Sequence, residues 1–412
     1  MSSAKLERYS AYINSGVEWL EQIPSHWKLT RNKDIFVERG SLSQSGGETL
    51  LTVSHITGVT RRSEKTVNMF MAETMEGYKH CRAGDLVINT MWAWMGALGT
   101  AREDGICSPA YGVYAPRKGL PYSHGYFDYL YRTPKAVSEM TRNSKGIVSS
   151  RLRLYPKDFF QILTALPCYE EQAAIATYLD TRTAQIDRKM DLLGQKVAQY
   201  GKLKQSLIVA TVTRGLDTSV PMKDSGVEWI GEVPAHWEIK RIKDMSTLQS
   251  GISIVSEEIE EKGLYPVYGG NGLRGYFSKY TNDGEYILIG RQGALCGNIN
   301  YASGKFWASE HAVVVYLSNR VNLKWYAGVL RVMNLNQYSI AAAQPGLAVD
   351  RIKRLLLPVP PYKEQICIGA YLDEKTAQID RIVVAINSQI ERLKDLRKAL
   401  INDAVTGKIR VV

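Results

Sequence analysis

The sequence lacks the patterns that mark several common classes of protein. Its five cysteines are scattered and form no Cys-x-x-Cys pair, which argues against a structural zinc site and a disulfide framework. No apolar run approaches the roughly 20 residues that a membrane-spanning helix needs. The first residues, MSSAKLERYSAY, lack the apolar core of a signal peptide. We therefore expect a cytoplasmic protein with no membrane partner.

The motifs of nucleotide-dependent enzymes are missing as well. There is no G-x-x-x-x-G-K-[ST] loop, and no G-x-G-x-x-G turn stands between a strand and a helix. No carboxylates cluster with a lysine as in a nuclease site. His26 and His236 stand apart from other metal-ligating residues, so packed, hydrogen-bonded side chains are the simpler interpretation. We expect no catalytic residue, metal or cofactor in this chain.

What the sequence does contain is an excess of positive charge. The 412 residues include 52 Lys and Arg against 41 Asp and Glu, a formal charge of +11. This excess suits a polyanionic partner such as nucleic acid, although many enzymes are equally basic. The length allows two or three domains.

The sequence also contains an internal duplication. Residues 15–35 (SGVEWLEQIPSHWKLTRNKDI) return at 225–245 with 11 of 21 positions identical, and YLDTRTAQIDR at 178–188 returns at 371–381 with nine of 11 identical. The segments between these blocks, roughly 36–165 and 246–358, share only faint echoes, such as 84–99 beside 284–297. A repeated frame with divergent inserts is typical of a scaffold that presents two different reading surfaces.

Long helices are predicted after Pro167 and Pro361, because proline-free stretches follow with acidic residues in the first turn. Each stretch carries an apolar residue at every seventh position, and flanking residues such as Leu203 and Leu396 widen both stripes. Two helices of about 40 residues, each roughly 60 Å long, would bury these seams against each other. The chain order favours antiparallel pairing, and parallel pairing between molecules stays open. The coiled-coil positions are Leu179, Ile186, Leu193, Tyr200, Leu207, Leu372, Ile379, Ile386, Leu393 and Leu400.

The divergent inserts hold the candidate nucleic-acid contacts. Lys and Arg neutralise phosphates, whereas Arg, Asn and Gln can make paired hydrogen bonds to base edges. The candidates lie near glycine-rich turns and basic clusters. They are Arg61, Arg62, Lys65, Trp92, Asn143, Ser144, Lys145, Arg151, Asn271, Arg274, Tyr276, Arg291, Gln292, His311 and Gln344.

An acidic pattern recurs on the two predicted helices. Either it is a solvated helix face, or it is a docking surface that a partner protein uses twice. The docking candidates are Asp180, Gln185, Asp187, Asp373, Gln378 and Asp380.

These motifs resemble those of type I restriction–modification specificity subunits. The similarity rests on three motifs that are present in both copies. They are S-G-V-E-W-[LI]-x-x-[IV]-P-x-H-W, the Tyr-x-Glu-Gln start of each long helix, and Y-L-D-x-x-T-A-Q-I-D. The resemblance implies an α+β fold: two mixed α/β target recognition domains in a pseudo-two-fold arrangement, separated by two long helices that form an antiparallel coiled coil. The implied domains are 1–165, 166–214, 215–358 and 359–412.

The resemblance further implies a non-catalytic subunit whose two domains each read one half of a bipartite, gapped site on double-stranded DNA. It implies assembly with two modification (methyltransferase) subunits and with restriction (translocase and nuclease) subunits. S-adenosylmethionine, ATP and Mg²⁺ would belong to those partners.

Two alternatives stay open from the residues alone. The chain could be a coiled-coil adaptor whose inserts bind proteins, and its DNA affinity would then show no steep dependence on salt. It could also be a diverged DNA enzyme, in which case the purified chain would be active alone.

Overall fold

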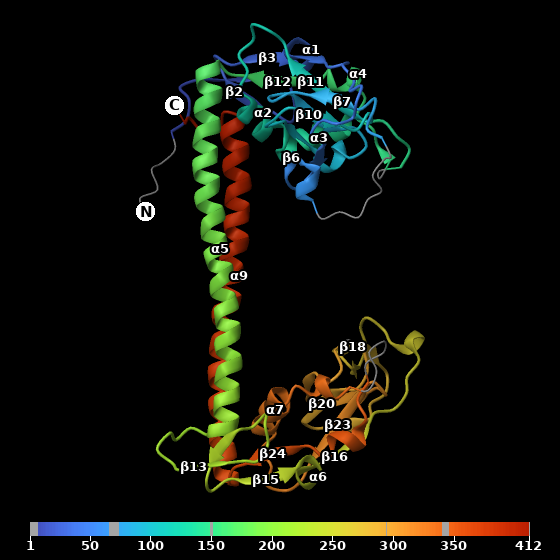
Figure 1. The fold of residues 1–412 in the computed structure, drawn as a ribbon, viewed down its shortest axis with the longest axis vertical. Helices are drawn as coiled ribbons and strands as arrows, with labels where there is room; N and C mark the ends of the chain where they lie inside the picture. Colours follow the sequence, from blue (N-terminus) through green and yellow to red (C-terminus); the bar gives the residue numbers. More distant parts are fainter. Residues whose placement is uncertain (1–6, 66–73, 149–150, 294, 340–345, 412) are drawn as a thin grey trace. The chain divides into compact units, whose positions relative to one another are not determined.

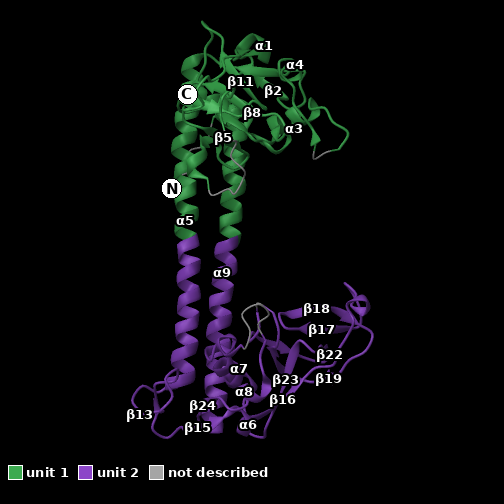
Figure 2. Ribbon diagram, turned by 45° about the vertical axis from the view of Figure 1, so that its right-hand side comes forward, with its two compact units in different colours: residues 1–193, 388–412 green, residues 194–387 purple. Residues whose placement is uncertain are grey.

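The computed structural model describes residues 7–65, 74–148, 151–293, 295–339 and 346–411. The chain forms two compact units: unit 1 comprises residues 1–193 and 388–412, and unit 2 comprises residues 194–387 (Figure 2). Each unit contains part of both long helices. The domain boundaries implied at 165, 214 and 358 stay a prediction.

Unit 1 is built around a four-stranded antiparallel sheet with the order β4-β11-β8-β9 (Figure 1). These strands are Phe36–Glu38, Tyr111–Pro116, Leu86–Asn89 and Leu98–Thr100. Four smaller strand pairs accompany it: β1 (Tyr12–Asn14) with β2 (Gln22–Pro24), β3 (Lys28–Arg31) with β12 (Leu163–Leu166), β5 (Leu51–Ser54) with β6 (Gly58–Arg61), and β7 (Lys79–Cys81) with β10 (Gly105–Cys107). The short helices are α1 (Asn32–Ile35), α2 (His124–Tyr131), α3 (Pro134–Arg142) and α4 (Pro156–Phe159).

Unit 2 repeats this frame with the sheet order β16-β23-β20-β21. These strands are Ser246–Ser250, Ala312–Leu317, Tyr286–Gly290 and Ile299–Ala302. The pairs β13 (Met222–Asp224) with β14 (Glu232–Pro234) and β15 (Glu238–Arg241) with β24 (Leu356–Val359) match their counterparts in unit 1, as do α6 (Ile242–Met245), α7 (Leu323–Val332) and α8 (Val349–Ile352). The faint sequence echo therefore corresponds to β8 and β20.

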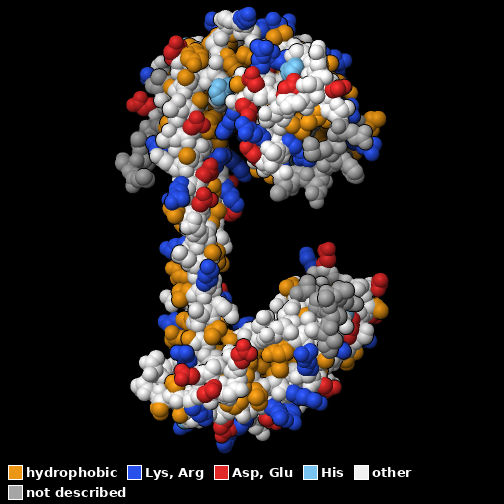
Figure 3. All heavy atoms as spheres, viewed as in Figure 1, with side chains coloured by type: hydrophobic (Ala, Val, Ile, Leu, Met, Phe, Trp, Pro, Cys, Tyr) orange, Lys and Arg blue, Asp and Glu red, His pale blue; other side chains and the backbone are white. Residues whose placement is uncertain are grey.

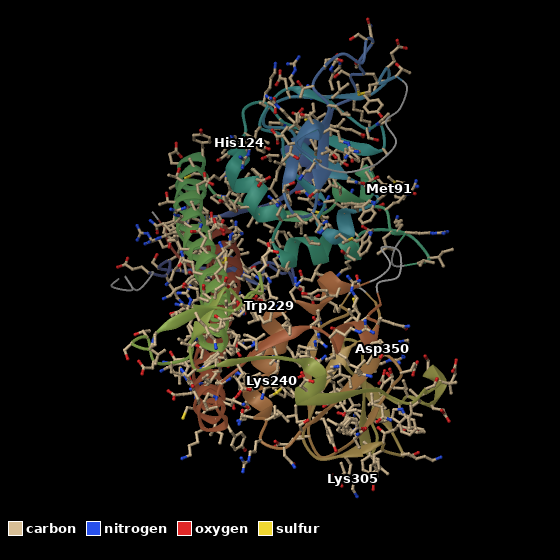
Figure 4. The ribbon with its side chains drawn as sticks, turned by 60° about the horizontal axis from the view of Figure 1, so that its bottom comes forward. Met91, His124, Trp229, Lys240, Lys305 and Asp350 are labelled. Atoms are coloured by element: carbon tan, nitrogen blue, oxygen red, sulfur yellow. The ribbon has the colours of Figure 1, made fainter. Side chains whose placement is uncertain are left out.

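The divergent part of unit 2 is a second sheet with the order β18-β17-β22-β19. Its strands are Gly272–Phe277, Tyr265–Gly269, Lys305–Ala308 and Asn282–Asp283. Lys305 of this sheet lies at the end of unit 2 away from the long helices, whereas Trp229 and Lys240 lie beside those helices (Figure 4). The two inserts thus elaborate a common frame differently.

Both faces of each four-stranded sheet are covered. In β8, Leu86 and Ile88 belong to the main core of unit 1, while Val87 faces a second cluster with Leu51 and Cys107. In unit 2, β20 divides its alternate residues in the same way. Because successive side chains point to opposite faces, these central strands are apolar along most of their length, with Asn89 at the end of β8 as the polar exception.

The long helices are α5 (Tyr169–Arg214) and α9 (Tyr362–Val405), and they run antiparallel within each unit. In unit 1 the Tyr126 hydroxyl lies 3.3 Å from the carbonyl oxygen of Ala165, just before α5, and 3.0 Å from that of Val405, at the end of α9. In unit 2 the glycine after α5, Gly215, packs against Glu364 in the first turn of α9.

The heptad residues lie on the buried sides of these helices. All ten predicted seam positions are buried or half-buried. Leu203 and Leu396, expected to widen the stripes, are instead 52% and 54% exposed, so that part of the prediction is wrong. Such drift is expected when a helix of 3.6 residues per turn carries a seven-residue repeat.

The start of each long helix is tied to its unit by a Glu-Gln pair. Glu171 accepts hydrogen bonds from Tyr9 and contacts His26 Nε2 at 3.1 Å, and Glu364 contacts His236 Nε2 at 2.9 Å. Burial and the Glu171 carboxylate raise the pKa of Tyr9 well above its usual range. The repeated Pro-x-His-Trp histidines are therefore hydrogen-bonded, as the sequence indicated. Their side chains are 55% and 45% exposed, so the expectation that they are packed is wrong.

The glutamines that follow are buried and bridge backbone groups. Gln365 donates from Nε2 to the Pro360 carbonyl (2.9 Å) and accepts the Asn322 N–H at Oε1 (3.0 Å), at the start of α7. Gln172 makes the equivalent bonds to Pro167 and Ser123 before α2. These side chains connect the sheet-rich part of each unit to the start of a long helix.

We predict that Gln365→Ala lowers the free energy of unfolding by about 1–3 kcal/mol, because it leaves backbone groups of Pro360 and Asn322 without partners. Gln378→Ala, on the same helix and exposed, is the matched control and should change stability by less than about 0.5 kcal/mol. Urea unfolding followed by tryptophan fluorescence measures both. Equal effects of the two substitutions would contradict this role.

Candidate nucleic-acid interface

Unit 2 brings several of the predicted contact residues together. The Arg291 N–H donates to the His311 carbonyl (2.8 Å), and Asn298 Nδ2 donates to Asn271 Oδ1 (3.4 Å). The turn at Gly270 packs onto Gln292, since a Cβ added at Gly270 would lie 2.8 Å from the Gln292 carbonyl oxygen. Only glycine permits this close approach. Asn271, Arg291, Gln292 and His311 thus form one polar cluster.

Other unit 2 candidates lie at or beyond the edge of this cluster. Arg274 is exposed and its aliphatic stem packs on Gly269. Tyr276 is half-buried farther along β18, where its backbone pairs with Glu260. His311 also contacts Glu310 (Nε2–Oε1 3.0 Å), so an acidic side chain lies beside the cluster. Gln344 lies outside the described residues.

In unit 1 the first basic group lies at the end of β6. The Arg61 guanidinium binds the Glu103 carboxylate with an Nη2–Oε2 distance of 2.6 Å, which lowers the pKa of Glu103 and raises that of Arg61. The Lys65 ammonium donates to the Thr57 hydroxyl. Arg62 begins a 3₁₀ turn (Arg62–Glu64) beside them. The charge of Arg61 is therefore largely neutralised within the unit.

The second group of unit 1 follows α3. Asn143 donates to the carbonyl and side chain of Glu139, and Ser144 donates to the Met140 carbonyl (2.7 Å). These two residues terminate the helix, and their donors are committed to it. Lys145 Nζ pairs with Asp158 at 3.0 Å, whereas the Arg151 side chain is exposed. Trp92 is 49% exposed and stacks on Trp94.

Sequence reasoning missed two residues of this kind. Arg153 is exposed, and its Nη2 lies 4.0 Å from the Met91 sulfur next to Trp92; Asn298 belongs to the unit 2 cluster. Both lie close in sequence to predicted candidates, Arg151 and Gln292, but no motif distinguished them from other exposed polar residues. Lys, Arg, Asp and Glu side chains are interspersed over the visible face in Figure 3 rather than segregated by sign.

The repeated acidic residues of the long helices have partners within the chain. Tyr129 donates to Asp180 (2.8 Å), and Lys324 binds Asp373 at the equivalent place in unit 2. Asp187 pairs with Arg397 of α9, and Asp380 pairs with Lys204 of α5. The repetition thus has an internal explanation. Gln185 accepts from Arg182, and Gln378 is exposed; docking through any of these six residues stays a prediction.

Within the residues described, no group of three or more His, Cys, Asp or Glu side chains is arranged to hold a metal ion. The described helices include none long and apolar enough to cross a membrane.

Comparisons with known proteins agree on one family. The family model for the type I restriction modification DNA specificity domain matches residues 234–392. The chain is 46% identical over 139 residues to the type I restriction enzyme EcoprrI specificity subunit of Escherichia coli, covering 33% of this chain and 35% of that protein. It is 30% identical over 126 residues to a putative type I restriction enzyme specificity subunit of Haemophilus influenzae, covering 30% and 33%. The chain is therefore similar to type I restriction–modification specificity subunits, most clearly over residues 234–392.

The chain matches about a third of the length of these two curated relatives. Solved structures extend the likeness in fold over nearly the whole specificity subunit. A chain from a structural study of complex assembly and conformational transition of the type I R-M system superposes with a TM-score of 0.73 at 16% identity, covering 93% of this chain and 98% of that one. The HsdS subunit from Thermoanaerobacter tengcongensis gives a TM-score of 0.58 at 17% identity, covering 94% and 98%. The mixed helix-and-sheet fold class is thereby confirmed.

We predict that Asp187 and Arg397 are energetically coupled in the isolated specificity subunit. A double-mutant cycle with Asp187→Ala and Arg397→Ala should give a coupling of about 0.2–1 kcal/mol, the range for partly exposed ion pairs. The cycle is measured by urea unfolding at low salt, and the coupling should shrink at high salt. No coupling in the isolated chain, together with weaker binding of a partner by Asp187→Ala alone, would instead favour the docking interpretation.

Proposed function

We propose that this chain is the DNA sequence-recognition subunit of a type I restriction–modification complex and has no catalytic activity of its own. The observation that carries the proposal is the duplicated frame: the sheets β4-β11-β8-β9 and β16-β23-β20-β21 have the same order, yet they present different polar and aromatic residues. Two copies of one scaffold with different exposed chemistry suit two different half-sites on double-stranded DNA.

Each unit would read one half of a bipartite, gapped site through its divergent segments. Phosphate contacts from exposed Lys and Arg would supply affinity, and hydrogen bonds or stacking would supply sequence preference. The polar cluster of unit 2 supports this proposal, because guanidinium and amide groups suit base edges. The similarity to type I specificity subunits supports it as well.

The proposal assigns the chemistry to partner subunits in the cytoplasm. Two modification subunits would bind S-adenosylmethionine and methylate adenine, and restriction subunits would use ATP and Mg²⁺ for translocation and cleavage. The long helices α5 and α9 would dock the modification subunits and set the spacing between the two half-sites.

The first test is a genome-wide map of methylated adenine in cells that express the chain with its modification subunit, compared with cells that lack the chain. We expect a single gapped, two-part motif that disappears when the chain is absent. Unchanged methylation, with the modification subunit shown to be active and bound to the chain, would contradict the proposal and favour an adaptor.

The spacing role predicts a second result. Inserting one heptad into both helices, after Leu193 and after Asn387, adds about 10 Å to the pair at 1.5 Å per residue. At 3.4 Å per base pair, the gap in the methylated motif should change by about three base pairs. Inserting the same seven residues into the connection between α5 and β13 is the control and should leave the gap unchanged. An unchanged gap in the helix variant, with the complex intact, would rule out this role.

A further inference from the structure

A short segment is anchored in the same way in both units, directly after the third strand of each four-stranded sheet. In unit 1 the Leu154 N–H donates to the Thr90 carbonyl (3.0 Å), and in unit 2 the Leu347 N–H donates to the Arg291 carbonyl (2.9 Å). Thr90 follows β8 and Arg291 follows β20. Both anchors use backbone atoms only, so they do not depend on which side chains the segment carries.

In unit 1 this segment presents an aromatic pair on a rigid base. The Trp92 N–H donates to the Asn89 carbonyl (3.0 Å), and the Trp94 indole N–H donates to the Met91 carbonyl (3.0 Å). Gly96 ends the turn with φ +83° and packs against Val137 of α3. Met91 lies on the side of unit 1 away from α5, whereas His124 lies next to that helix (Figure 4).

The Trp92 ring is parallel to the Trp94 ring, with centroids 6.3 Å apart and an interplanar angle of 17°. Trp94 thus supports one face of Trp92 within the unit, while 49% of Trp92 remains exposed. Removal of water from a large aromatic ring stabilises the complex that covers it. Such rings stack on bases without regard to base identity. An exposed ring on a rigid support is suited to a planar ligand.

An arginine side chain contacts the residue that precedes Trp92. Arg153 lies beside Met91, and the exposed Arg151 is two residues earlier. Asp158, the acidic residue that follows Arg153 most closely in sequence, is paired with Lys145. Cations around an aromatic platform are the combination that binds the backbone and bases of nucleic acid.

In unit 2 the equivalent segment carries hydrogen-bonding groups instead. Arg291 is half-buried with its Nη1 3.3 Å from the Ser250 hydroxyl, and the exposed Gln292 lies against the Gly270–Asn271 turn. Guanidinium and amide groups can make paired hydrogen bonds to guanine and adenine, respectively. The same position in the frame therefore has different chemistry in the two units.

We propose that residues 90–95 and 291–293 are the base-contacting segments of units 1 and 2, that Trp92 inserts at a base step of one half-site and stacks on a base there, and that Arg291 and Gln292 bind base edges of the other. This inference rests on the proposed DNA-recognition function and deepens it. The stacking unit selects its half-site through base-step geometry and flexibility, whereas the hydrogen-bonding unit selects through base identity.

The test maps adenine methylation by the assembled methyltransferase for four variants: Trp92→Ala, Trp92→Leu, Trp92→Phe and Gln292→Ala. Trp92→Ala and Trp92→Leu should each reduce discrimination in one half of the motif about 10- to 100-fold, and Trp92→Phe, which keeps a flat ring, should retain most of it. Gln292→Ala should relax only the other half. Trp92→Leu preserves apolar bulk, so its result holds even where Trp92→Ala lowers the amount of folded protein.

The wild-type map separates failure of this inference from failure of the proposed function. Without a two-part motif in the wild type, the recognition function itself is wrong. With that motif present, an unchanged motif in the Trp92 variants overturns the inference, as does an equal loss of discrimination in both halves. Full activity of Trp92→Leu would show that stacking is not the contact, which also overturns it.

Discussion

Antiparallel pairing of α5 and α9 is the constraint on which the rest of the structure depends. It brings the last turns of each helix into the unit where the other helix begins, so Ala404 and Val405 belong to the core of unit 1, and Ile208 and Val212 belong to that of unit 2. Neither sheet-rich segment has a complete core without them. Since burial of apolar area is the main source of stability, each head needs both helices to fold.

Residues at the start of each long helix attach it to the sheet-rich part of its unit. Glu171 and Glu364 hold the repeated histidines, and Gln172 and Gln365 hold the backbone that leads into α2 and α7. Asp180 and Asp373 then bind Tyr129 and Lys324 on those connecting helices or beside them. Asp180 and Asp373 of the repeated acidic pattern thus have equivalent positions but different internal partners, a tyrosine hydroxyl in unit 1 and a lysine in unit 2.

Much of this was predictable, because repeats and heptads are local signals. The extents of α5 and α9 follow closely from proline and apolar spacing, and the duplicated frame follows from the repeated blocks. The order of the strands in each sheet could not be predicted, since β4 pairs with β11 across more than seventy intervening residues that share no pattern. The site was predictable only in part. The backbones of Asn271, Arg291, Gln292 and His311 lie close together, as expected for one contact surface. No local sequence pattern indicated that Glu103 would pair with Arg61 or that Asn143 would end a helix.

The backbone anchors at Thr90 and Arg291 carry a consequence for how such a protein changes over generations. A segment held by its main chain can exchange its side chains with little cost to folding, because the bonds that position it remain when the residues are replaced. The residues that the segment presents and the residues that build the frame can therefore change almost separately. A few substitutions in the segment would alter the chemistry that a unit presents, while the frame that holds the segment is left intact.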